Sequence, residues 1–394
     1  MKLYLQFGNG MMSICKELTS QCSNLGTILS PRDLPPKKMD QFGGELHANN
    51  GFVLIDPQMY APQSSRGSLP EYEYRFSGRD TRTGNPEEHL ALWFALNKHI
   101  HATECILPGR YLKRINEQTL RYSETILELA KEYPFSKLAS LCLDSSVFAD
   151  VDQIDFLLNR IVSWPVDGVY LIADHPDHEY YVEDPVWLYN LLRLCSGIKS
   201  SGRKVIVGYS NQQMLCLCCA GVDAIASGTH MNVRTFSLDK FGEEDASFKK
   251  RKPWYYCPAA LSEFSLQFLD MAAQQNILHL FQTNRELSGG YADILFSGVS
   301  PSSTGFSEHH AFRHYLHCLA RQCEESNLPS FNARLDQQRK LLEGARKLLA
   351  FLHRHGVRGQ SRDFLSAIDI NLAALDRFSA EHGFLLRHRD DMFS

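Results

Sequence analysis

Three aspartates come directly after apolar runs of the chain. Asp56 follows GFVLI, Asp144 follows KLASLCL and Asp174 follows GVYLIA. A carboxylate at the end of a buried strand can serve as general acid, general base or nucleophile. It can also accept two parallel hydrogen bonds from the amidine-like edge of a base. The pattern therefore predicts catalytic roles for Asp56, Asp144 and Asp174, with capping of the following turn or helix as the alternative for each.

The stretch from Arg203 to Arg234 contains a second group of candidates. It reads as a strand ending at Gly208, a helix over 212–220 that ends at Gly221, and a strand over 222–226. Such a unit makes two parallel strands, and ligands bind beyond the carboxyl ends of parallel strands. We therefore predict ligand contacts in the two segments that follow these strands. The candidates are Gly208, Tyr209, Ser227, Gly228 and His230.

Eight short apolar runs alternate with helix-like segments along the first part of the chain. The runs are continuous, as expected for parallel strands covered on both faces. Eight strand–helix units in roughly 230 residues match a (β/α)8 barrel, or TIM barrel, with a doubly wound open sheet as the alternative. No Gly-x-Gly-x-x-Gly follows a strand, and no P-loop or Gly-x-Ser-x-Gly elbow is present. Strands are predicted at 2–7, 27–30, 51–55, 104–107, 137–143, 168–173, 205–207 and 222–226.

The chain is predicted to divide at residue 260. Residues 1–260 form the α/β barrel, with a long insertion at 57–86 where no periodicity is visible. Loops of this length are more often functional than decorative. Residues 261–394 form a helical C-terminal extension packed on the barrel. Helices are predicted at 11–22, 37–48, 87–102, 112–133, 150–164, 185–200, 212–220, 261–275, 307–323, 332–355 and 361–382.

The composition is that of a globular protein. Of 394 residues, 44% are hydrophobic and 22% charged, and the net charge is −4, so no overall basic field indicates nucleic-acid binding. The local run Lys249-Lys250-Arg251-Lys252 is a candidate nucleic-acid contact, with a solvated loop as the alternative. Eleven cysteines, most of them in apolar segments, indicate buried reduced thiols and a cytoplasmic location. No signal peptide is recognised, and no apolar run reaches the roughly 20 residues that span a membrane.

Two histidine-rich segments raise the question of metal binding. Asp174-His175-Pro176-Asp177-His178 is dense in potential ligands, but no third-ligand pattern accompanies it. His310, His314 and His317 fall on one face of a helix outside the barrel. We predict a polar rim loop for the first segment and no metal or other cofactor for the protein. A metal-dependent hydrolase built on the first segment is the alternative.

Three segments together resemble motifs of the tRNA-guanine transglycosylase family. Gly221–Arg234 resembles the family run Gly-(Val/Ile)-Asp-Met-Phe-Asp-Cys-(x)3-Thr-Arg-(x)2-Arg. The segment IDPQMY, Ile55–Tyr60, resembles its third-strand motif, and LSPR, Leu29–Arg32, falls at its second-strand motif. The resemblance covers about residues 25 to 236, in order and spacing more than residue by residue. SPRDL followed by LIDPQMY resembles the divergent transglycosylase-like proteins of type IV CBASS anti-phage operons.

The resemblance implies that a free 7-deazaguanine-type base replaces a base in a nucleoside through a covalent glycosyl-enzyme. It implies that Asp56 handles protons, and that Gln58 and the five ligand-contact positions named above bind the base. The nucleophile position of the family falls on Ala226, which cannot attack. Base exchange therefore requires Asp56, Asp144 or Asp223 to act as nucleophile. The alternative is a protein that binds a 7-deazaguanine base, or a macromolecule bearing it, without glycosidic chemistry.

The resemblance also bears on metals and partners. The family's structural zinc motif, Cys-x-Cys-x-x-Cys with a later histidine, is missing, since Cys257, Cys318 and Cys323 do not reproduce it. The implied partners are a 7-deazaguanine-type base, a polymer that is tRNA, DNA or a base-modified protein, and a second copy in a homodimer, with no membrane. Arg234 and the basic run that ends at Lys252 are the positions expected to contact the nucleic acid.

Overall fold

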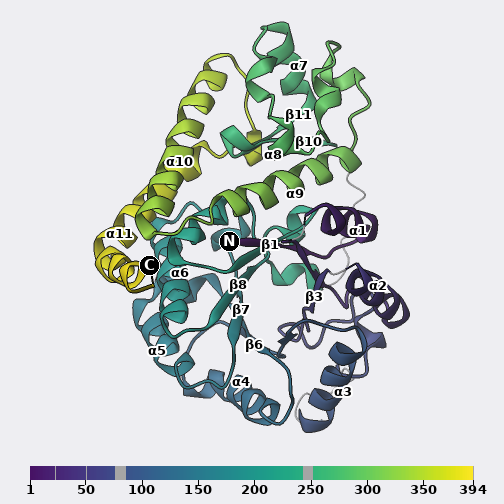
Figure 1. The fold of residues 1–394 in the computed structure, drawn as a ribbon, viewed down its shortest axis with the longest axis vertical. Coiled ribbons are helices and arrows are strands. Elements are labelled where there is room, and N and C mark those ends of the chain that lie inside the picture. The colour runs from purple at the N-terminus through teal and green to yellow at the C-terminus, as the bar shows by residue number, and fades with distance from the viewer. Residues whose placement is uncertain (23, 50, 76–85, 243–251, 394) are drawn as a thin grey trace.

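A curled parallel β-sheet lies at the centre of the molecule (Figure 1). The computed structural model describes residues 1–22, 24–49, 51–75, 86–242 and 252–393. The strand order is β3-β2-β1-β9-β8-β7-β6-β4, all pairs are parallel, and the short β5 pairs with the end of β6. The strands are β1 (Lys2–Gln6), β2 (Gly26–Leu29), β3 (Phe52–Ile55), β4 (Cys105–Ile106), β5 (Tyr111–Leu112), β6 (Lys137–Leu143), β7 (Gly168–Ala173), β8 (Lys204–Gly208) and β9 (Ala224–Ser227).

Both faces of this sheet are buried, which explains the continuous apolar runs. Leu54, Ile172 and Ala226 belong to a cluster inside the curl, and their neighbours along each strand pack under the outer helices. The two ends of the strand order approach each other where Thr103, before β4, donates its backbone N–H to the Val53 carbonyl at 2.8 Å. No ladder between β3 and β4 is seen in the described residues. The α/β class and the eight predicted strands are confirmed, in an order that runs without the reversal of a doubly wound sheet.

Helices follow the strands and cover the outer face of the sheet. The segment Gln212–Ala220, predicted as an α-helix, is a 3₁₀ helix with all nine residues buried. It ends at Gly221, whose φ of 74° is the left-handed conformation expected of a helix-terminating glycine. The helices of this layer are α1 (Met12–Gln21), α2 (Pro36–Ala48), α3 (Pro86–His99), α4 (Glu117–Ala130), α5 (Val151–Ile161) and α6 (Pro185–Ser200).

The strand β5 replaces the start of the helix predicted over 112–133. Tyr111 and Leu112 pair with Cys142 and Leu143 at the carboxyl end of β6. Helix α4 begins only after Asn116, whose side chain caps it by accepting the Thr119 N–H. Pairing with a distant strand thus prevails over the local helical pattern, and it places Tyr111 at the carboxyl edge of the sheet.

The chain leaves the sheet after β9 and returns to it with α9 (Glu308–Glu325). Between them lie the antiparallel hairpin of β10 (Trp254–Cys257) and β11 (Ser262–Ser265), followed by α7 (Leu266–Gln274) and α8 (Arg285–Ser288), at the top of Figure 1. Helix α9 packs on β1 and α1, beside the junction of the first and last strands. The boundary predicted at residue 260 falls inside the hairpin, and β11 occupies the start of the helix predicted at 261–275.

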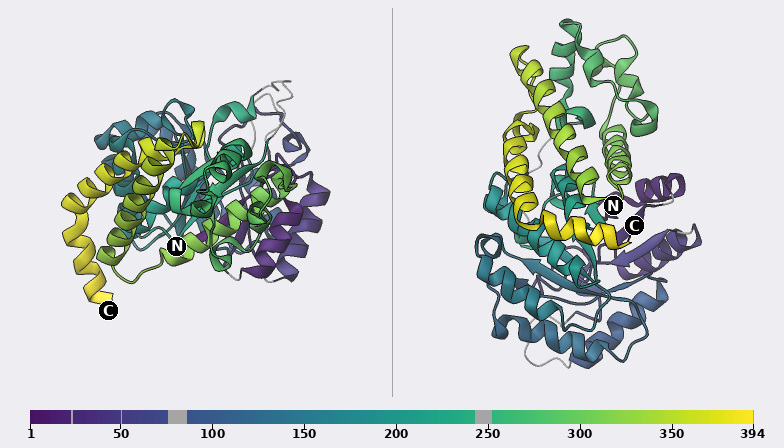
Figure 2. Two further views of the ribbon diagram at one scale, coloured as in Figure 1. Left: turned by 90° about the horizontal axis from the view of Figure 1, so that it is seen from above. Right: turned by 60° about the vertical axis from the view of Figure 1, so that its left-hand side comes forward.

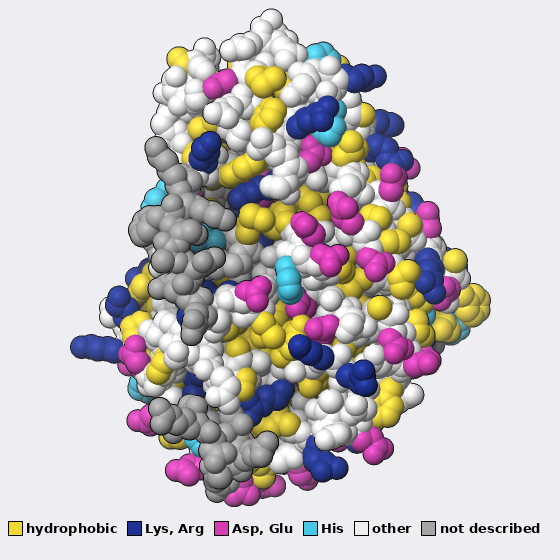
Figure 3. Space-filling view, turned by 180° about the vertical axis from the view of Figure 1, so that it is seen from behind, with side chains coloured by type: hydrophobic (Ala, Val, Ile, Leu, Met, Phe, Trp, Pro, Cys, Tyr) yellow, Lys and Arg dark blue, Asp and Glu magenta, His cyan; other side chains and the backbone are white. Residues whose placement is uncertain are grey.

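Two long helices complete the chain. Helices α10 (Phe331–Arg354) and α11 (Leu365–Phe393) pack on each other, and α11 packs on α6. Figure 2 shows both along one flank, with the end of α11 reaching beyond the body of the molecule. None of the helices in the described residues is long and apolar enough to cross a membrane. Acidic and basic side chains are interspersed on the face shown in Figure 3.

Candidate active site at the carboxyl edge of the sheet

Asp56 lies wholly buried at the carboxyl end of β3. Its Oδ2 accepts hydrogen bonds from the hydroxyls of Tyr60 at 2.8 Å and Tyr209 at 3.0 Å, with that of Tyr170 at 3.4 Å. Its Oδ1 accepts the backbone N–H of Gln58 at 3.0 Å. Burial raises the pKa of Asp56, and these hydrogen bonds oppose the rise without cancelling it. Asp56 is therefore a buried acceptor at the centre of three phenol groups.

The tyrosines reach Asp56 from three separate segments. Tyr60 belongs to the insertion after β3, Tyr170 to the inner face of β7, and Tyr209 follows β8 with a φ of 54°. Gly208 makes space for this arrangement, because a Cβ at that position would lie 2.4 Å from the Tyr170 hydroxyl oxygen. The ligand contact predicted for Gly208 is thus replaced by a packing role.

Two carboxyls, those of Asp144 and Asp174, follow β6 and β7 and are bridged by Tyr111. The Tyr111 hydroxyl oxygen is 2.7 Å from Asp144 Oδ2 and 2.7 Å from Asp174 Oδ2. A phenol has one proton to donate, so one of the two contacts requires a protonated carboxyl that donates to Tyr111. Asp144 also accepts the Ser146 N–H at 2.9 Å, which confirms that it caps the following turn.

The surroundings of these two carboxyls move their pKa values in opposite directions. Burial raises the pKa of Asp174, which is 2% exposed, and the Tyr111 hydrogen bond and the neighbouring His178 only partly oppose this. Burial also tends to raise the pKa of Asp144, but hydrogen bonds from Ser146 and Tyr111 outweigh it and hold that pKa below its usual value. Of the two carboxyls, Asp174 is therefore the one that binds a proton more readily. A carboxyl pair separated in this way can act as acid and base.

The carboxyl end of the curled sheet, which we call the mouth, is closed above Asp56 by residues 235–241. We call these residues the cover. Phe236 of the cover forms an isolated parallel bridge with Asp174 and is 1% exposed. Its ring centroid lies 5.3 Å from that of Tyr60 and 5.4 Å from that of Tyr209. The cover therefore fills the space beyond the strand ends with an aromatic ring.

Lys240 of the cover lies over the same aromatic group. Its Nζ is 3.3 Å from the centroid of the Tyr209 ring and 5.0 Å from that of Phe241, an arrangement that favours an ammonium group. Burial nevertheless lowers the pKa of Lys240 well below its usual value; Arg32 lowers it further, and Asp56 opposes both. Lys240 forms no ion pair within the described part of the chain.

Two further predicted base-contact residues serve the scaffold. Gln58 accepts the Arg32 backbone N–H through Oε1 at 2.9 Å and donates from Nε2 to Ser30 Oγ at 2.9 Å, so it ties the ends of β2 and β3 together. Ser227 points away from the mouth, where its Oγ lies 3.3 Å from the Tyr315 hydroxyl of α9. Its position follows from the alternation of β9, in which Ala226 faces inward.

The remaining two positions lie at the margin of the site. A Cβ on Gly228 would be 2.5 Å from the Gln6 carbonyl, so this glycine permits close packing of the backbone. The His230 ring packs against Phe312 of α9 with centroids 4.8 Å apart. Of the six residues predicted to bind the base, Tyr209 is the one whose side chain contacts the Asp56 carboxylate.

The residues predicted to contact nucleic acid differ in where the structure places them. Arg234 is buried and pairs with Glu263 at 2.8 Å, while Glu263 also pairs with Arg362 at 2.7 Å. This cluster joins the segment after β9 to the hairpin, so the surface role predicted for Arg234 does not fit its position. Lys249, Lys250 and Arg251 lie outside the described residues. Lys252 is exposed beside a cavity of about 50 Å³.

The histidine segments do not assemble a metal site. His175 is buried, with its Nδ1 3.0 Å from the Glu179 carbonyl oxygen, and His178 faces Asp174. On α9, His314 and His317 bond the carbonyls of Tyr256 and Leu287, and His310 bonds Ser307 at the helix start. No group of three His, Cys, Asp or Glu side chains in the described ranges is arranged to hold a metal ion. All eleven cysteines are free and buried.

Neither Ala226 nor Asp223 is placed to act as the nucleophile. Ala226 is buried inside the sheet with no reactive group. Asp223 precedes the strand, where Lys199 Nζ lies 2.9 Å from its Oδ2 and the Val205 N–H donates to it at 2.7 Å. Asp223 is therefore at the amino edge of the sheet, and a register slip cannot bring it to the mouth.

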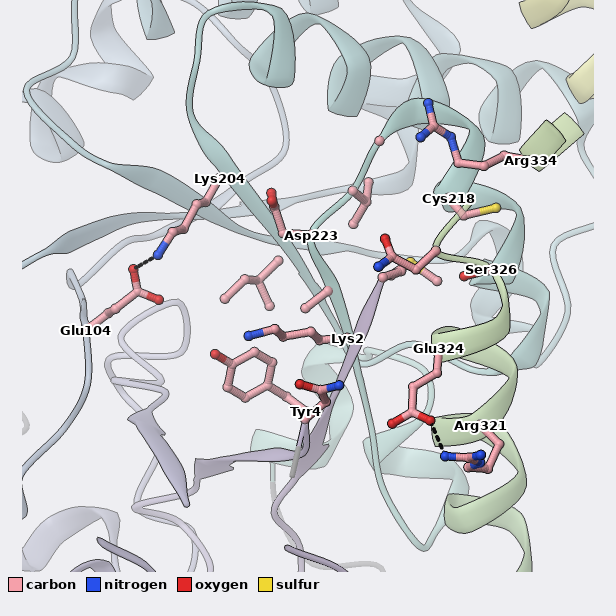
Figure 4. Close-up of a pocket in the computed structure, with 17 residues that line it drawn as sticks. Lys2, Tyr4, Glu104, Lys204, Cys218, Asp223, Arg321, Glu324, Ser326 and Arg334 are labelled. Carbon is pink, nitrogen blue, oxygen red and sulfur yellow. Dashed lines mark hydrogen bonds and ion pairs between the residues drawn. The ribbon is translucent and has the colours of Figure 1, made fainter. Parts of the chain in front are cut away.

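The amino edge also carries an opening, a cavity of about 730 Å³ (Figure 4). Its charged side chains are mostly paired: Lys204 with Glu104 at 2.8 Å and Arg321 with Glu324 at 2.5 Å. Charges paired in this way stabilise the fold, whereas Asp56, Asp144 and Asp174 pair with no Lys or Arg in the described part of the chain. We therefore place the candidate active site at the opposite, carboxyl edge.

The residues missed by the sequence interpretation are mainly aromatic. Tyr170 shares the inward side of β7 with Asp174, four residues on, so strand alternation alone could have indicated it. Tyr111 was assigned to no strand, and Phe236 and Lys240 follow β9 without any motif. Their positions depend on contacts with distant segments.

No family model matches the chain, and no curated protein shows a significant match. Two solved structures are similar in part. Thiamine phosphate pyrophosphorylase from Pyrococcus furiosus is 12% identical, over 62% of this chain and 89% of its own, with a TM-score of 0.33. The carboxyl transferase domain of Rhizobium etli pyruvate carboxylase with 3-bromopyruvate is 11% identical, over 97% of this chain and 78% of its own, with a TM-score of 0.39.

Proposed function

We propose that this protein is a transglycosylase-like enzyme that handles a 7-deazaguanine-type base at the carboxyl edge of its sheet. The observation that carries the proposal is the bridge Asp144–Tyr111–Asp174, in which the pKa of Asp144 is lowered and that of Asp174 is raised. Transfer of an N-glycosidic bond uses such a pair, since a carboxylate attacks carbon while the leaving base takes up a proton. The sequence resemblance supplies the substrate class.

In the proposed reaction, the two carboxyls divide the work. Asp144 attacks the anomeric carbon as the bond to the outgoing base breaks, and a glycosyl ester forms on the enzyme. Asp174 gives its proton to the nitrogen of the outgoing base. The incoming base then attacks the same carbon and releases Asp144, and its proton returns to Asp174. Tyr111 holds both carboxyls in place throughout.

Asp56 is assigned recognition in this proposal. Its Oδ2 already accepts hydrogen bonds from the Tyr60 and Tyr209 hydroxyls, which disfavours attack on an anomeric carbon. A carboxylate at a strand end can also accept N–H donors from the edge of a base. This replaces the proton-handling role that the family resemblance implied.

The test is mass spectrometry of the protein incubated with a 7-deazaguanine base and with tRNA, DNA or a base-bearing protein. We expect an exchanged base in the polymer or an adduct on the enzyme, and its loss in Asp144→Asn and Asp174→Asn. Asp150→Asn is the matched control, because Asp150 is an exposed helix cap that asparagine can replace. Exchange that continues in both site variants would refute the proposed roles.

A second candidate function is binding of the base without glycosidic chemistry. It is favoured by Ala226, which faces the interior where the family has its nucleophile. In that case the wild-type protein binds the base, and neither an adduct nor an exchanged polymer is detected.

Finer features belong to the same proposal. We infer that β3 and β4 complete a closed (β/α)8 barrel, supported by the Thr103–Val53 hydrogen bond. The resemblance further suggests a cytoplasmic protein of anti-phage defence that acts as a homodimer. Light scattering of the purified protein and scanning of the β3–β4 seam by hydrogen exchange would test the two structural points.

A further inference from the structure

The cover makes aromatic contacts of the kind that a bound ring would make. Phe236 lies between Tyr60 and Tyr209 on one side and Tyr111 on the other, where the ring centroids are 6.2 Å apart and the planes differ by 28°. Lys240 adds a cation 5.5 Å from the Phe236 centroid. A planar group is thus held above Asp56 by three tyrosines and one ammonium group.

Polar atoms inside the curl remain unsatisfied in this closed state. Gln6 is wholly buried on the inner face of β1, and its Oε1 accepts the Tyr170 hydroxyl at 3.0 Å, while its Nε2 has no partner in the described part of the chain. Ser140 Oγ on β6 is likewise buried without a partner there. A buried donor left unpaired destabilises the closed state. The Phe236 side chain has no hydrogen-bonding group that could pair with Gln6 Nε2 or Ser140 Oγ.

The cover is attached to its surroundings by side-chain hydrogen bonds and by the bridge between Phe236 and Asp174. Ser64 donates from Oγ to the Phe241 carbonyl at 2.7 Å, and Arg32 donates from Nη1 to the Lys240 carbonyl at 3.3 Å. Beside it lies an open depression of about 800 Å³, lined by Tyr60, Leu238 and Phe241 among others. Lys240 Nζ also donates to the Asn232 carbonyl at 3.2 Å, and open space lies beside these attachments.

We infer that Phe236 holds the place of a planar, N–H-bearing aromatic ligand, and that residues 235–241 withdraw when this ligand binds over Asp56. The inference rests on the proposed function in taking the carboxyl edge as the binding site. A heteroaromatic ring would keep the stacking that Phe236 provides. In addition, its N–H groups would donate to Asp56, and a ring acceptor would satisfy Gln6.

Binding to such a site is weakened in the wild-type protein by the fraction of molecules in which the cover is closed. Phe236→Ala removes the internal ring, and Lys240→Ala removes the ammonium group over Tyr209. Asp239→Ala changes an exposed side chain of the same cover and serves as the matched control. The probes are 7-deazaguanine and adenine, with the dissociation constant measured by titration calorimetry on the full chain.

We expect a dissociation constant at least tenfold lower in Phe236→Ala than in the wild type, and no change in Asp239→Ala. Hydrogen exchange of the wild-type protein provides a measurement that needs no variant. Addition of whichever probe binds, 7-deazaguanine or adenine, should accelerate hydrogen exchange in peptides covering residues 231–242, because the cover leaves its site. If Phe236→Ala fails to fold, two other measurements test the inference: a lower dissociation constant in Lys240→Ala, and the hydrogen exchange of the wild-type protein.

The outcomes separate the inference from the proposed function. Tighter binding of adenine but not of 7-deazaguanine would support the displaced cover and remove the proposed substrate class. Tighter binding of 7-deazaguanine supports both. If neither ring binds the variants more tightly, or if the ring slows exchange in the cover, the inference is overturned.

Discussion

The two edges of the parallel sheet hold their charges in opposite ways. At the amino edge, Glu104 and Asp223 pair with lysines at 2.8 and 2.9 Å around an open cavity. At the carboxyl edge, Asp56 and Asp144 accept hydrogen bonds from tyrosine hydroxyls, and neither forms an ion pair with Lys or Arg of the described residues. Both edges have an open cavity, of about 730 Å³ at the amino edge and about 800 Å³ at the carboxyl edge, so the charges and not the cavities distinguish them.

This difference teaches that the partners of the carboxyl groups are a better guide to the reactive site here than cavity size, which is similar at the two edges. A carboxyl without a cationic partner costs free energy in a buried place, and it changes its pKa. Such a cost is characteristic of sites that bind or transform a ligand. Four predictions test whether the two edges differ in this way.

The largest effect is expected from removal of the Asp174 carboxyl, which is proposed as the general acid. Asp174→Asn should lower the rate of base exchange by roughly 10²–10⁴-fold, the usual contribution of a general acid. Asp223→Asn at the amino edge should leave that rate unchanged. Rates of label incorporation into the polymer provide the measurement, and equal losses at both edges would contradict the comparison.

The next effect concerns the packing of the carboxyl edge. Gly208→Ala should lower the free energy of unfolding by about 1–3 kcal/mol, because a Cβ would lie 2.4 Å from the Tyr170 hydroxyl oxygen. Gly44→Ala in α2 is the control; nothing lies within 4 Å of its Cβ position, and a gain of about 0.5–1 kcal/mol is expected. Urea unfolding followed by circular dichroism measures both, and a neutral Gly208→Ala would show that Tyr170 can move freely.

The pH dependence of stability should differ in sign between Asp174 and Asp144. The raised pKa of Asp174 means that the folded protein holds a proton after the unfolded chain has lost it. Its contribution to the free energy of unfolding therefore falls as pH rises from the usual carboxyl range through the raised pKa. The lowered pKa of Asp144 stabilises the fold above the usual carboxyl pKa, and this is lost on acidification.

Substitution of each aspartate separates the two pH dependences of the unfolding free energy. Asp174→Asn should remove the fall at higher pH, and Asp144→Asn should remove the loss in acid. Both effects should be smaller than that of Gly208→Ala. Unfolding free energies measured from about pH 2 to 8 check the signs, because the Asp144 contribution is lost below the usual carboxyl pKa. Equal slopes in the two variants would contradict the acid–base assignment.

The smallest effect is expected at the amino edge. Glu104→Gln breaks the contact with Lys204, whose side chain is 53% exposed, so the loss should be under about 1 kcal/mol. High salt should reduce the difference further. A loss as large as that of Gly208→Ala would show that the amino edge is as tightly organised as the carboxyl edge.

The sheet could be predicted because its signal is local. Each strand is a continuous apolar run bounded by turn residues, and Gly221 ends its helix in the left-handed conformation that the sequence suggested. The positions of Asp56, Asp144 and Asp174 follow directly from these strand ends. The structure confirms that all three lie at the carboxyl edge.

Other features depend on contacts between distant residues. Helix α9 lies beside β1, although some 300 residues separate them in the chain, and only packing of both on the outer layer decides this. The ladder between β5 and β6 replaced a helical pattern that was locally stronger. The side chain of Arg234 turned inward to Glu263, where a basic residue in a motif had suggested a surface contact.

The sequence by itself therefore determined the α/β class, the strands and the carboxylates at their ends, since apolar runs and turn residues act within a few positions. The tertiary structure alone decided what surrounds those carboxylates. Tyr111 reaches Asp174 across 63 positions, and Tyr209 reaches Asp56 across 153. Burial and hydrogen bonding set the protonation of each carboxyl, and both are properties of the assembled edge, which no short stretch of the chain contains.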